Sequence, residues 1–316
     1  MSEAETGTGL AVHRCDYAGP ADLQQMQELA QRIWSPASRW HVGDLAWGRY
    51  SIPDNEPGWR TALWTADGND RVVGWGWVEL PGSLELLVDP AHVEVARDVL
   101  AWFDQVTDAT SGVRTVTVLE TEQHLMAALE QAGYAPRSGG PFFRHHHLSL
   151  EGLPEPVLPD GFRLRSVHQG EAELRAASHR AAWSDLGPSS VCTESYAAVM
   201  AAWPYRHDFD WVVEGPEGAF VANALGWLDE HNAVGLLEPV GCAPAYRRLG
   251  LARAANLAAL RALRAAGART AVVCPRGDDA YPVPGRLYRS IGFKPGARTV
   301  TYARPAPAAH TTRPGP

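Results

Sequence analysis

Lysine is almost absent from this chain of 316 residues, in which Lys294 is the single one and arginine supplies nearly all of the positive charge. Scarce lysine together with abundant alanine, glycine and proline is typical of a GC-rich bacterial genome and indicates no particular function. The formal net charge of −8 argues against nucleic acid as a partner, because domains that bind it concentrate basic residues on their surface.

Cysteine is also scarce, and no C-x-x-C pair occurs among Cys15, Cys192, Cys242 and Cys274. This spacing argues against a disulfide framework and indicates free thiols in a reducing compartment. A membrane-spanning helix needs about 20 consecutive apolar residues. No apolar run in this sequence approaches that length. The acidic beginning MSEAETGTG lacks the basic and then apolar order of a signal peptide. We therefore expect a cytoplasmic protein with no membrane partner.

The stretch from Gly235 to Gly267 predicts a strand, a tight turn and a long helix that ends at a glycine. Its turn, Arg247 to Ala252, reads R-x-x-G-x-A and is neither a Walker loop nor G-x-G-x-x-G. The first backbone N–H groups of a helix have no partner inside it and carry partial positive charge. Because a glycine lets an anion approach and arginines add full charges, the turn is predicted to bind phosphate. An ordinary turn with solvated arginines is the alternative.

This turn resembles the acetyl-CoA pyrophosphate loop of the GCN5-related N-acetyltransferase (GNAT) superfamily, whose signature is Q/R-x-x-G-x-G/A. The resemblance implies an acyltransferase with acetyl-CoA as co-substrate, which transfers the acetyl group to a primary amine of a small molecule by direct attack on the thioester. A non-catalytic acyl-CoA-binding protein, or a transferase for another acyl group or an O-acceptor, is the alternative. The implied cofactor-binding residues are Val240, Gly241, Cys242, Arg247, Arg248, Leu249, Gly250, Leu251, Ala252 and Arg253.

The order of predicted elements repeats on either side of residues 151–160, which contain three prolines and are typical of a linker. The halves end alike, in ALEQAGYAPRSGGPFFRHHHLSL and LYRSIGFKPGARTVTYAR. We predict an α/β fold (α+β mixed sheet) of two tandem GNAT-like domains, each a mixed central sheet flanked by helices, similar to the arrangement of mycothiol synthase. The predicted parts are a disordered leader (1–9), a degenerate GNAT-like domain (10–150), the linker (151–160), a catalytic GNAT domain (161–304) and a disordered tail (305–316).

The first half departs from the family at the phosphate turn. Where the second half has CAPAYRRLGLA, the first has VDPAHVEVARD, which lacks the arginine pair and the glycine. Glu94 and Asp98 would repel a phosphate, because like charges destabilise each other at short range. The first half is therefore predicted to be non-catalytic. The second half is also the more basic one, with 18 bases and 14 acids in residues 156–316 against 10 and 22 in residues 1–155.

Glu238 is the predicted general base, because an ammonium with a pKa near ~10 must lose a proton before it attacks. The resemblance implies a base on this strand, directly before the phosphate turn. A strand-edge carboxylate paired with an arginine is the structural alternative, and Glu230 or Asp229 are weaker substitutes as base. Pro239 lacks an N–H and predicts a bulge or a parted edge at this point. The amides of residues 240–242 would then hold the pantetheine arm and polarise the thioester carbonyl.

Tyr288 is the predicted general acid for the leaving thiolate. It stands in LYRSIGF, which resembles the family's A-x-x-L-Y-x-x-x-G-F segment, although Pro284 replaces the usual alanine. The alternatives are a core aromatic at Tyr288 and a catalytic role for Tyr281.

The remaining candidate residues are better explained by structural roles than by catalysis or metal binding. Consecutive strand residues alternate faces, so His145, His146 and His147 cannot converge on one ion, and we expect no metal. Cys242 lacks a His–Asp pattern around it, which argues against an acyl-accepting nucleophile. Most aromatic residues on the helices before the second sheet are expected in the core, with one or two lining the acceptor pocket: His179, Trp183, Tyr196, Trp203 and Tyr205. The oligomeric state is predicted as monomer or homodimer.

Overall fold

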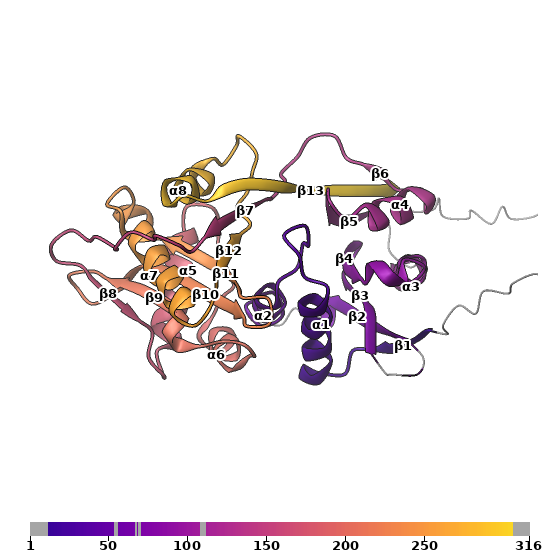
Figure 1. Ribbon diagram of the computed structural model, residues 1–316, viewed down its shortest axis with the longest axis horizontal. Coiled ribbons are helices and arrows are strands. Elements are labelled where there is room, and N and C mark those ends of the chain that lie inside the picture. Colours follow the sequence, from indigo (N-terminus) through magenta and orange to yellow (C-terminus); the bar gives the residue numbers. More distant parts are fainter. Residues whose placement is uncertain (1–11, 54–55, 67, 69–70, 108–111, 306–316) are drawn as a thin grey trace, which may run out of the picture. The chain divides into compact units, whose positions relative to one another are not determined.

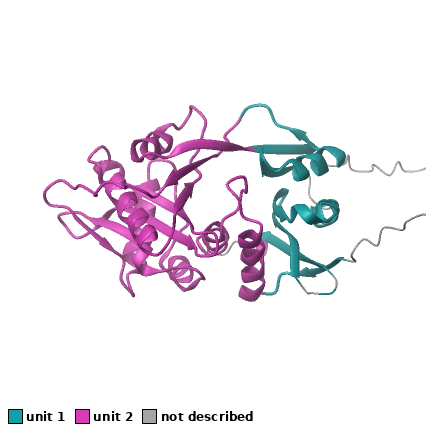
Figure 2. Cartoon of the chain, viewed as in Figure 1, with its two compact units in different colours: residues 1–18, 58–139, 300–316 teal, residues 19–57, 140–299 magenta. Residues whose placement is uncertain are grey.

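The computed structural model describes residues 12–305, apart from 54–55, 67, 69–70 and 108–111. Contacts divide the chain into two compact units that interleave along the sequence (Figure 2). Each unit contains a mixed β-sheet flanked by helices (Figure 1), which confirms the predicted fold class. The predicted leader and tail lie outside the described residues, except Pro305, which ends the last strand. Unit 1 comprises residues 1–18, 58–139 and 300–316, and unit 2 comprises residues 19–57 and 140–299.

Unit 1 is a sheet flanked by the helices α3 (Val95–Thr107) and α4 (Gln123–Gln131). Its strands are β1 (Val12–Asp16), β2 (Trp59–Ala66), β3 (Arg71–Glu79), β4 (Ser83–Val88), β5 (Val113–Leu119), β6 (Ala135–Pro136) and the C-terminal part of β13 (Lys294–Pro305). The order is β1-β2-β3-β4-β5-β13, with β6 paired to β13. Successive strands from β1 to β4 are antiparallel, whereas β4 and β5 are parallel. The short turn η1 (Glu56–Gly58) precedes β2.

Unit 2 has the sheet order β8-β9-β10-β11-β12-β7-β13. Its strands are β7 (Arg144–Ser149), β8 (Arg163–Ser166), β9 (Asp210–Glu214), β10 (Phe220–Asp229), β11 (Val234–Cys242), β12 (Thr270–Val273) and the N-terminal part of β13. Its helices are α1 (Pro20–Arg32), α2 (Val42–Tyr50), α5 (Ala172–Trp183), α6 (Thr193–Ala201), α7 (Leu251–Ala265) and α8 (Val283–Ile291), with the short turn η3 (His207–Phe209) before β9.

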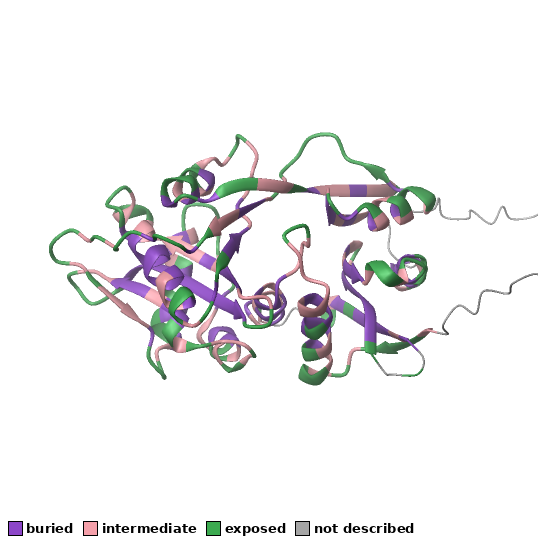
Figure 3. Ribbon diagram, in the orientation of Figure 1, coloured by how far each residue is buried: buried purple, intermediate pink, exposed green. Residues whose placement is uncertain are grey.

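The core of unit 2 forms on both faces of β10, which is buried along its whole length (Figure 3). Strand side chains alternate between faces. Gly226 therefore faces α7, where an added Cβ would lie 3.0 Å from Leu263, while Asn223 faces α5 and donates a hydrogen bond to Ser178. Both faces of the central strands are thus covered by helices.

Residues 19–57 of the first half belong to unit 2, as do residues 140–150, which lie before the predicted linker. The helix α2 was not predicted, because its Trp- and Gly-containing sequence has weak helical patterning. It packs on β10 and β11, and Ala46 joins the core around Trp227. A Cβ on Gly43 would lie 2.2 Å from Trp227, so only glycine allows this approach. The boundaries of the compact units therefore differ from the halves defined by sequence order.

The helices in the part of the chain that the structure describes are too short or too polar to cross a membrane.

Candidate active site

The predicted phosphate turn lies between β11 and α7, after the short turn η4 (Pro244–Tyr246). Gly250 is the N-cap of α7 and has φ 82°, a left-handed conformation that glycine adopts without strain. Arg248 is also left-handed, with φ 71°. Within the described residues, no acceptor is recorded for the six consecutive backbone N–H groups from Arg248 to Arg253, and the first helical bond of the turn runs from Ala254 to Gly250. An open row of N–H groups at a helix start is suited to an anion.

The arginines of this turn differ in their surroundings. Arg247 donates hydrogen bonds to both carboxylate oxygens of Asp185, at 2.6 and 2.8 Å, and to the carbonyls of Ala182 and Cys242. The Asp185 carboxylate also raises the pKa of Arg247 through this hydrogen bond. By contrast, Arg248 is exposed and Arg253 half-buried, and neither has a recorded partner within the described part of the chain. Arg247 therefore fastens the turn to the end of α5, and Arg248 and Arg253 retain their donors.

β11 parts from β12 directly before the turn. The two strands pair in parallel only from Val234 to Leu236. On its other edge β11 bulges, because Glu238 and Pro239 together lie opposite the single residue Leu225 of β10. The predicted irregularity at Pro239 is therefore present.

Beyond the bulge, β11 pairs again with β10, as Val240 opposite Ala224 and Gly241 opposite Asn223. The N–H of Ala243 donates to Val221 at 2.9 Å, which fixes the alternation of this antiparallel ladder. The N–H groups of Val240 and Cys242 then point away from β10, toward the side that β12 has left. Of the three predicted pantetheine-binding amides, these two are oriented toward the parting, whereas that of Gly241 faces β10.

Gly241 lies against α5. A Cβ at this position would lie 2.6 Å from Ala182 and 2.7 Å from Trp183, which leaves no room for a side chain. The ring of Trp183 stacks on His179 with centroids 4.3 Å apart. The glycine therefore lets α5 approach the parted strand.

Glu238 keeps part of its side chain accessible, yet burial raises its pKa to about 8, with the charge of Asp44 as the second cause. Burial also raises the pKa of Asp44 to about 7, against a hydrogen bond from the backbone of His41 and the charge of Arg39, which both lower it. Asp44 lies on α2, which packs on β11. The two carboxyl groups therefore titrate near neutral pH as an interacting pair.

Tyr288 is buried in α8, and its ring lies edge-on to Phe293 with centroids 5.7 Å apart. Burial raises the pKa of its phenol far above the usual value, and the charges of Glu238 and Cys274 raise it further. The phenol is therefore protonated at neutral pH. The predicted base lies close enough to the predicted acid for its charge to raise the pKa of Tyr288, although their catalytic roles stay predictions.

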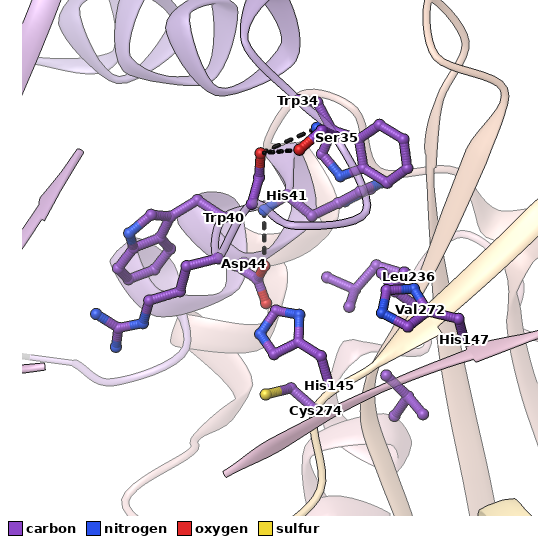
Figure 4. Close-up of a pocket in the computed structure, with 13 residues that line it drawn as sticks. Trp34, Ser35, Trp40, His41, Asp44, His145, His147, Leu236, Val272 and Cys274 are labelled. Atoms are coloured by element: carbon purple, nitrogen blue, oxygen red, sulfur yellow. Dashed lines mark hydrogen bonds between the residues drawn. The ribbon is translucent and has the colours of Figure 1, made fainter. Parts of the chain in front are cut away.

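A pocket lies beside these groups, entirely within unit 2 (Figure 4). Figure 4 shows the ring of His145 below the carboxylate of Asp44, with the thiol of Cys274 next to it. His147 lines the same pocket, whereas His146 lies outside it and is bonded through Nδ1 to the carbonyl of Arg144. Among the described residues, no group of three His, Cys, Asp or Glu side chains has the arrangement of a metal site. The lining residues are Trp34, Ser35, Ser38, Arg39, Trp40, His41, Asp44, His145, His147, Leu236, Val272, Val273 and Cys274.

The five aromatic residues proposed near an acceptor do not line this pocket. Tyr196 and Tyr205 both donate hydrogen bonds to Asp210, at 2.7 and 3.2 Å, and Asp210 also accepts one from the fully buried Arg175. These phenols therefore belong to a structural network. His179 and Trp183 belong to the stack beside Gly241, and Trp203 is 46% exposed.

The alternatives for the base and the acid have other surroundings. Asp229 accepts hydrogen bonds from Gln31 and Asn232, so it holds α1 to the turn after β10. Glu230 is exposed, 3.9 Å from Arg206. Tyr281 lies outside α8, near Arg247. The Cys242 thiol donates to the Tyr246 carbonyl, and burial raises its pKa to about 11, so it is protonated at neutral pH.

Sequence reasoning missed Asp44, His145 and Cys274 as site residues. Asp44 forms a capping box with His41, whose backbone N–H donates to the Asp44 Oδ2 at 2.9 Å. A Ser or Thr in place of His41 would have given the usual signature of such a box. The sequence order also assigns Asp44 to the first half, away from Glu238.

No protein-family model matches the chain. Three relatives are named mycothiol acetyltransferase. The one from Nocardiopsis dassonvillei is 29% identical over 300 residues, which cover 81% of this chain and 84% of the relative. The one from Saccharomonospora viridis is 30% identical over 163 residues, 48% of this chain and 52% of the relative. The one from Thermobispora bispora is 28% identical over 193 residues, 56% of this chain and 62% of the relative. The last two matches thus span less than two thirds of the relatives' length.

Solved structures resemble the chain over almost its whole length. A tandem GNAT protein from the clavulanic acid biosynthesis pathway has a TM-score of 0.64 at 18% identity, and the match covers 95% of this chain and all of that one. A GCN5-related N-acetyltransferase from Sphaerobacter thermophilus has a TM-score of 0.60 at 16% identity, with coverage of 94% and 96%. These likenesses confirm the tandem GNAT fold. The chain is therefore similar in sequence to mycothiol acetyltransferases and has the fold of tandem GNAT proteins.

Proposed function

We propose that the chain is an acetyl-CoA-dependent N-acetyltransferase that acetylates a primary amine of a small molecule in the site of unit 2. The observation that carries the proposal is the open row of N–H groups from Arg248 to Arg253 beside a strand that has parted from its neighbour. The name shared by the sequence relatives supports an acetyl group and a small acceptor. The proposal retains the expected cytoplasmic location.

Acetyl-CoA fits this site as a substrate. Its pyrophosphate would accept hydrogen bonds from the N–H groups of the turn, with Arg248 and Arg253 supplying positive charge. The amides of Val240 and Cys242 would hold the pantetheine arm, because their N–H groups face the parting between β11 and β12. Arg247, engaged with Asp185, would keep the turn in shape rather than bind phosphate itself.

Glu238 would take the proton of the acceptor ammonium. A carboxyl group with a pKa near 8 is a stronger base than an ordinary glutamate, and it matches a proton transfer at neutral pH better. The free amine would then attack the thioester carbonyl. Tyr288, protonated because burial raises its pKa, would donate its proton to the departing thiolate of CoA.

Acetyl-CoA consumption tests this proposal. Purified protein would be incubated with acetyl-CoA and a panel of primary amines, and released thiol and acetylated product would both be measured. We expect turnover by the wild type and at least about 100-fold less by Glu238→Gln. An acyl-CoA-binding protein without turnover would bind CoA equally in both forms and release thiol in neither. Equal turnover by wild type and variant would refute the assigned base.

A further inference from the structure

We propose that Asp44, together with Glu238 and His145, forms the subsite that binds the ammonium group of a cationic amine acceptor. The inference rests on the proposed function and names the class of acceptor that the site takes. It assigns a binding role to α2, a helix from the first half of the sequence that belongs to unit 2.

The geometry brings Asp44 to the parted strand. Asp44 and Leu236 line the same pocket, and Leu236 is the last residue of β11 that pairs with β12. Glu238 follows two residues later on the same strand. The capping hydrogen bond from His41 uses only the Oδ2 of Asp44, and within the described residues its Oδ1 has no recorded donor. One carboxylate oxygen of Asp44 is therefore available to a ligand.

His145 is an independent sign of a ligand site. The residue is 7% exposed, has no hydrogen-bond partner in the described part of the chain, and lines the pocket with its ring toward Asp44 (Figure 4). The ring nitrogens of His145 are not fully buried, so they keep hydrogen-bonding capacity toward the pocket. A polar ligand in the pocket would use that capacity.

The charge of the pocket favours a cation. Arg39 is the permanent cation among the lining residues. The histidines are neutral at pH 7, because burial lowers the pKa of His145 to about 3 and of His41 to about 4, and lowers that of His147 as well. The other groups facing the pair from α8 and from the end of β12 are Tyr288 and Cys274, both kept protonated because burial raises their pKa.

Asp44 lines the pocket with Arg39, and its charge also acts on Glu238 beside the pocket. When both carboxyl groups are ionised, the pair carries one negative charge more than Arg39 can balance, which is costly in a site shielded from water. Without a ligand, the pair avoids this cost by retaining a proton. A bound ammonium supplies the missing charge, and the pair then ionises fully. Cationic amines are therefore preferred over neutral amines, and their binding releases a proton.

The reaction balances through the same groups. The ammonium, held by the Asp44 carboxylate, gives one proton to Glu238. The neutral amine forms the C–N bond, the C–S bond breaks, and the thiolate takes a proton from Tyr288. The second proton of the attacking nitrogen restores the Tyr288 phenol. The products are the acetamide, CoA thiol and one proton, which Glu238 returns to solvent.

The test compares Asp44→Asn with the wild type. The Asn amide oxygen still accepts the capping bond from His41, so α2 keeps its start while the charge is lost. Glu217→Gln, in the exposed turn between β9 and β10, is the control for removal of a carboxylate from unit 2. Ethanolamine and glucosamine serve as cationic probes and aniline as a neutral one. Calorimetry on the CoA-loaded protein, in two buffers of different ionisation enthalpy, gives affinity and proton release.

We expect a cationic probe to bind with release of a proton, and Asp44→Asn to weaken that binding about 10- to 100-fold, as for loss of a charged hydrogen-bond partner. Glu217→Gln should bind as the wild type does. In turnover assays Asp44→Asn should raise KM more than it lowers kcat. Failure of both cationic probes to bind, preference for aniline, or equal affinity in Asp44→Asn would each overturn the inference. If one of these results occurs but the protein still consumes acetyl-CoA, the inference fails and the proposed function stands. If the cationic probes bind as expected but acetyl-CoA is not consumed, the proposed function fails and the inferred binding site stands.

Discussion

Two strand-to-helix turns of this chain occupy equivalent places in their units but differ in how their backbone N–H groups are hydrogen-bonded. In unit 1, β4 leads through η2 (Pro90–His92) into α3, and in unit 2, β11 leads through η4 into α7. The Asp89 carboxylate accepts the N–H of Ala91 at 2.9 Å, and Arg97 donates its N–H to the carbonyl of Glu94. The unit 1 turn therefore occupies several of its donors with its own oxygens and places carboxylates beside them. The unit 2 turn leaves a row of donors open and places arginines there.

The positions of the two candidate catalytic residues of unit 2 are occupied by apolar residues in unit 1. Two residues beyond the last parallel pair, β11 has Glu238, whereas β4 has the buried Leu86. Four residues before the glycine that ends the helix, α8 has Tyr288, whereas α4 has Leu129. The sheets themselves part alike, since β4 also pairs with β5 over only two residues. The parting of parallel strands is thus common to both units, and the chemistry depends on the bulge, the turn and two side chains.

The largest expected effect comes from reversing the charge of the unit 2 turn. Arg248→Glu with Gly250→Glu should weaken CoA binding by about 100-fold or more, because carboxylates replace donors that a phosphate needs. His92→Glu in the unit 1 turn is the matched control and should bind CoA as the wild type does. Calorimetric titration with CoA measures both, and circular dichroism checks that the double variant is folded, since Gly250 is left-handed. If only the His92→Glu variant lost CoA binding, the CoA site would lie at the unit 1 turn instead.

Glu238→Gln should lower kcat by about 100- to 1000-fold, within the usual range for loss of a general base. CoA affinity should stay unchanged, because the substitution lies outside the phosphate turn. Glu85→Gln on β4 is the control from the other unit and should retain full activity. In the wild type, kcat/KM should rise with pH as Glu238 loses its proton, with an apparent pKa near 8. A wild-type rate that is flat from pH 6 to 9 would argue against this carboxyl group as the base.

Tyr288→Phe should lower kcat by about 10- to 100-fold, the size expected for loss of a donor to a developing thiolate. Phenylalanine keeps the edge-on packing with Phe293, so the thermal stability should change little. An acetyl thioester whose thiol is more acidic than CoA distinguishes a general-acid role of Tyr288 from a packing role. With such a thioester, a general acid matters less, and the effect of Tyr288→Phe should shrink. An effect of the same size with both thioesters would assign Tyr288 to packing.

The smallest effect concerns the pair of Arg247 and Asp185, which is partly exposed. Partly exposed ion pairs contribute little, so Arg247→Met and Asp185→Asn should each weaken CoA binding by about two- to fivefold. Both residues act by fastening the turn to α5. The double variant should therefore bind CoA no more weakly than whichever single variant binds it more weakly. Additive losses would mean that Arg247 also contacts the phosphate, as its place in the sequence motif predicts.

The sequence predicted the parts of the site that local pattern determines. The motif at residues 247–252 predicts a turn between a strand and a long helix, and β11, this turn and α7 follow one another in that order. Pro239 cannot donate within a ladder, and the bulge lies there. What pattern could not predict is which unit each segment joins. α2 is buried in unit 2 through contacts such as Ala46 with Trp227, and β7 adds His145 to the same unit. Asp44 therefore comes close to Glu238, and His145 close to Asp44, through packing between segments far apart in the chain, which no local signal reports.

Amide hydrogen exchange with and without CoA tests the contrast between the two turns most directly. The backbone N–H groups of residues 248–253 lack acceptors in the described structure, so a bound pyrophosphate must slow their exchange if it binds there. We predict strong protection confined to this turn, and no change in residues 89–97. Protection of residues 89–97, or of neither turn while CoA is bound, would contradict the account.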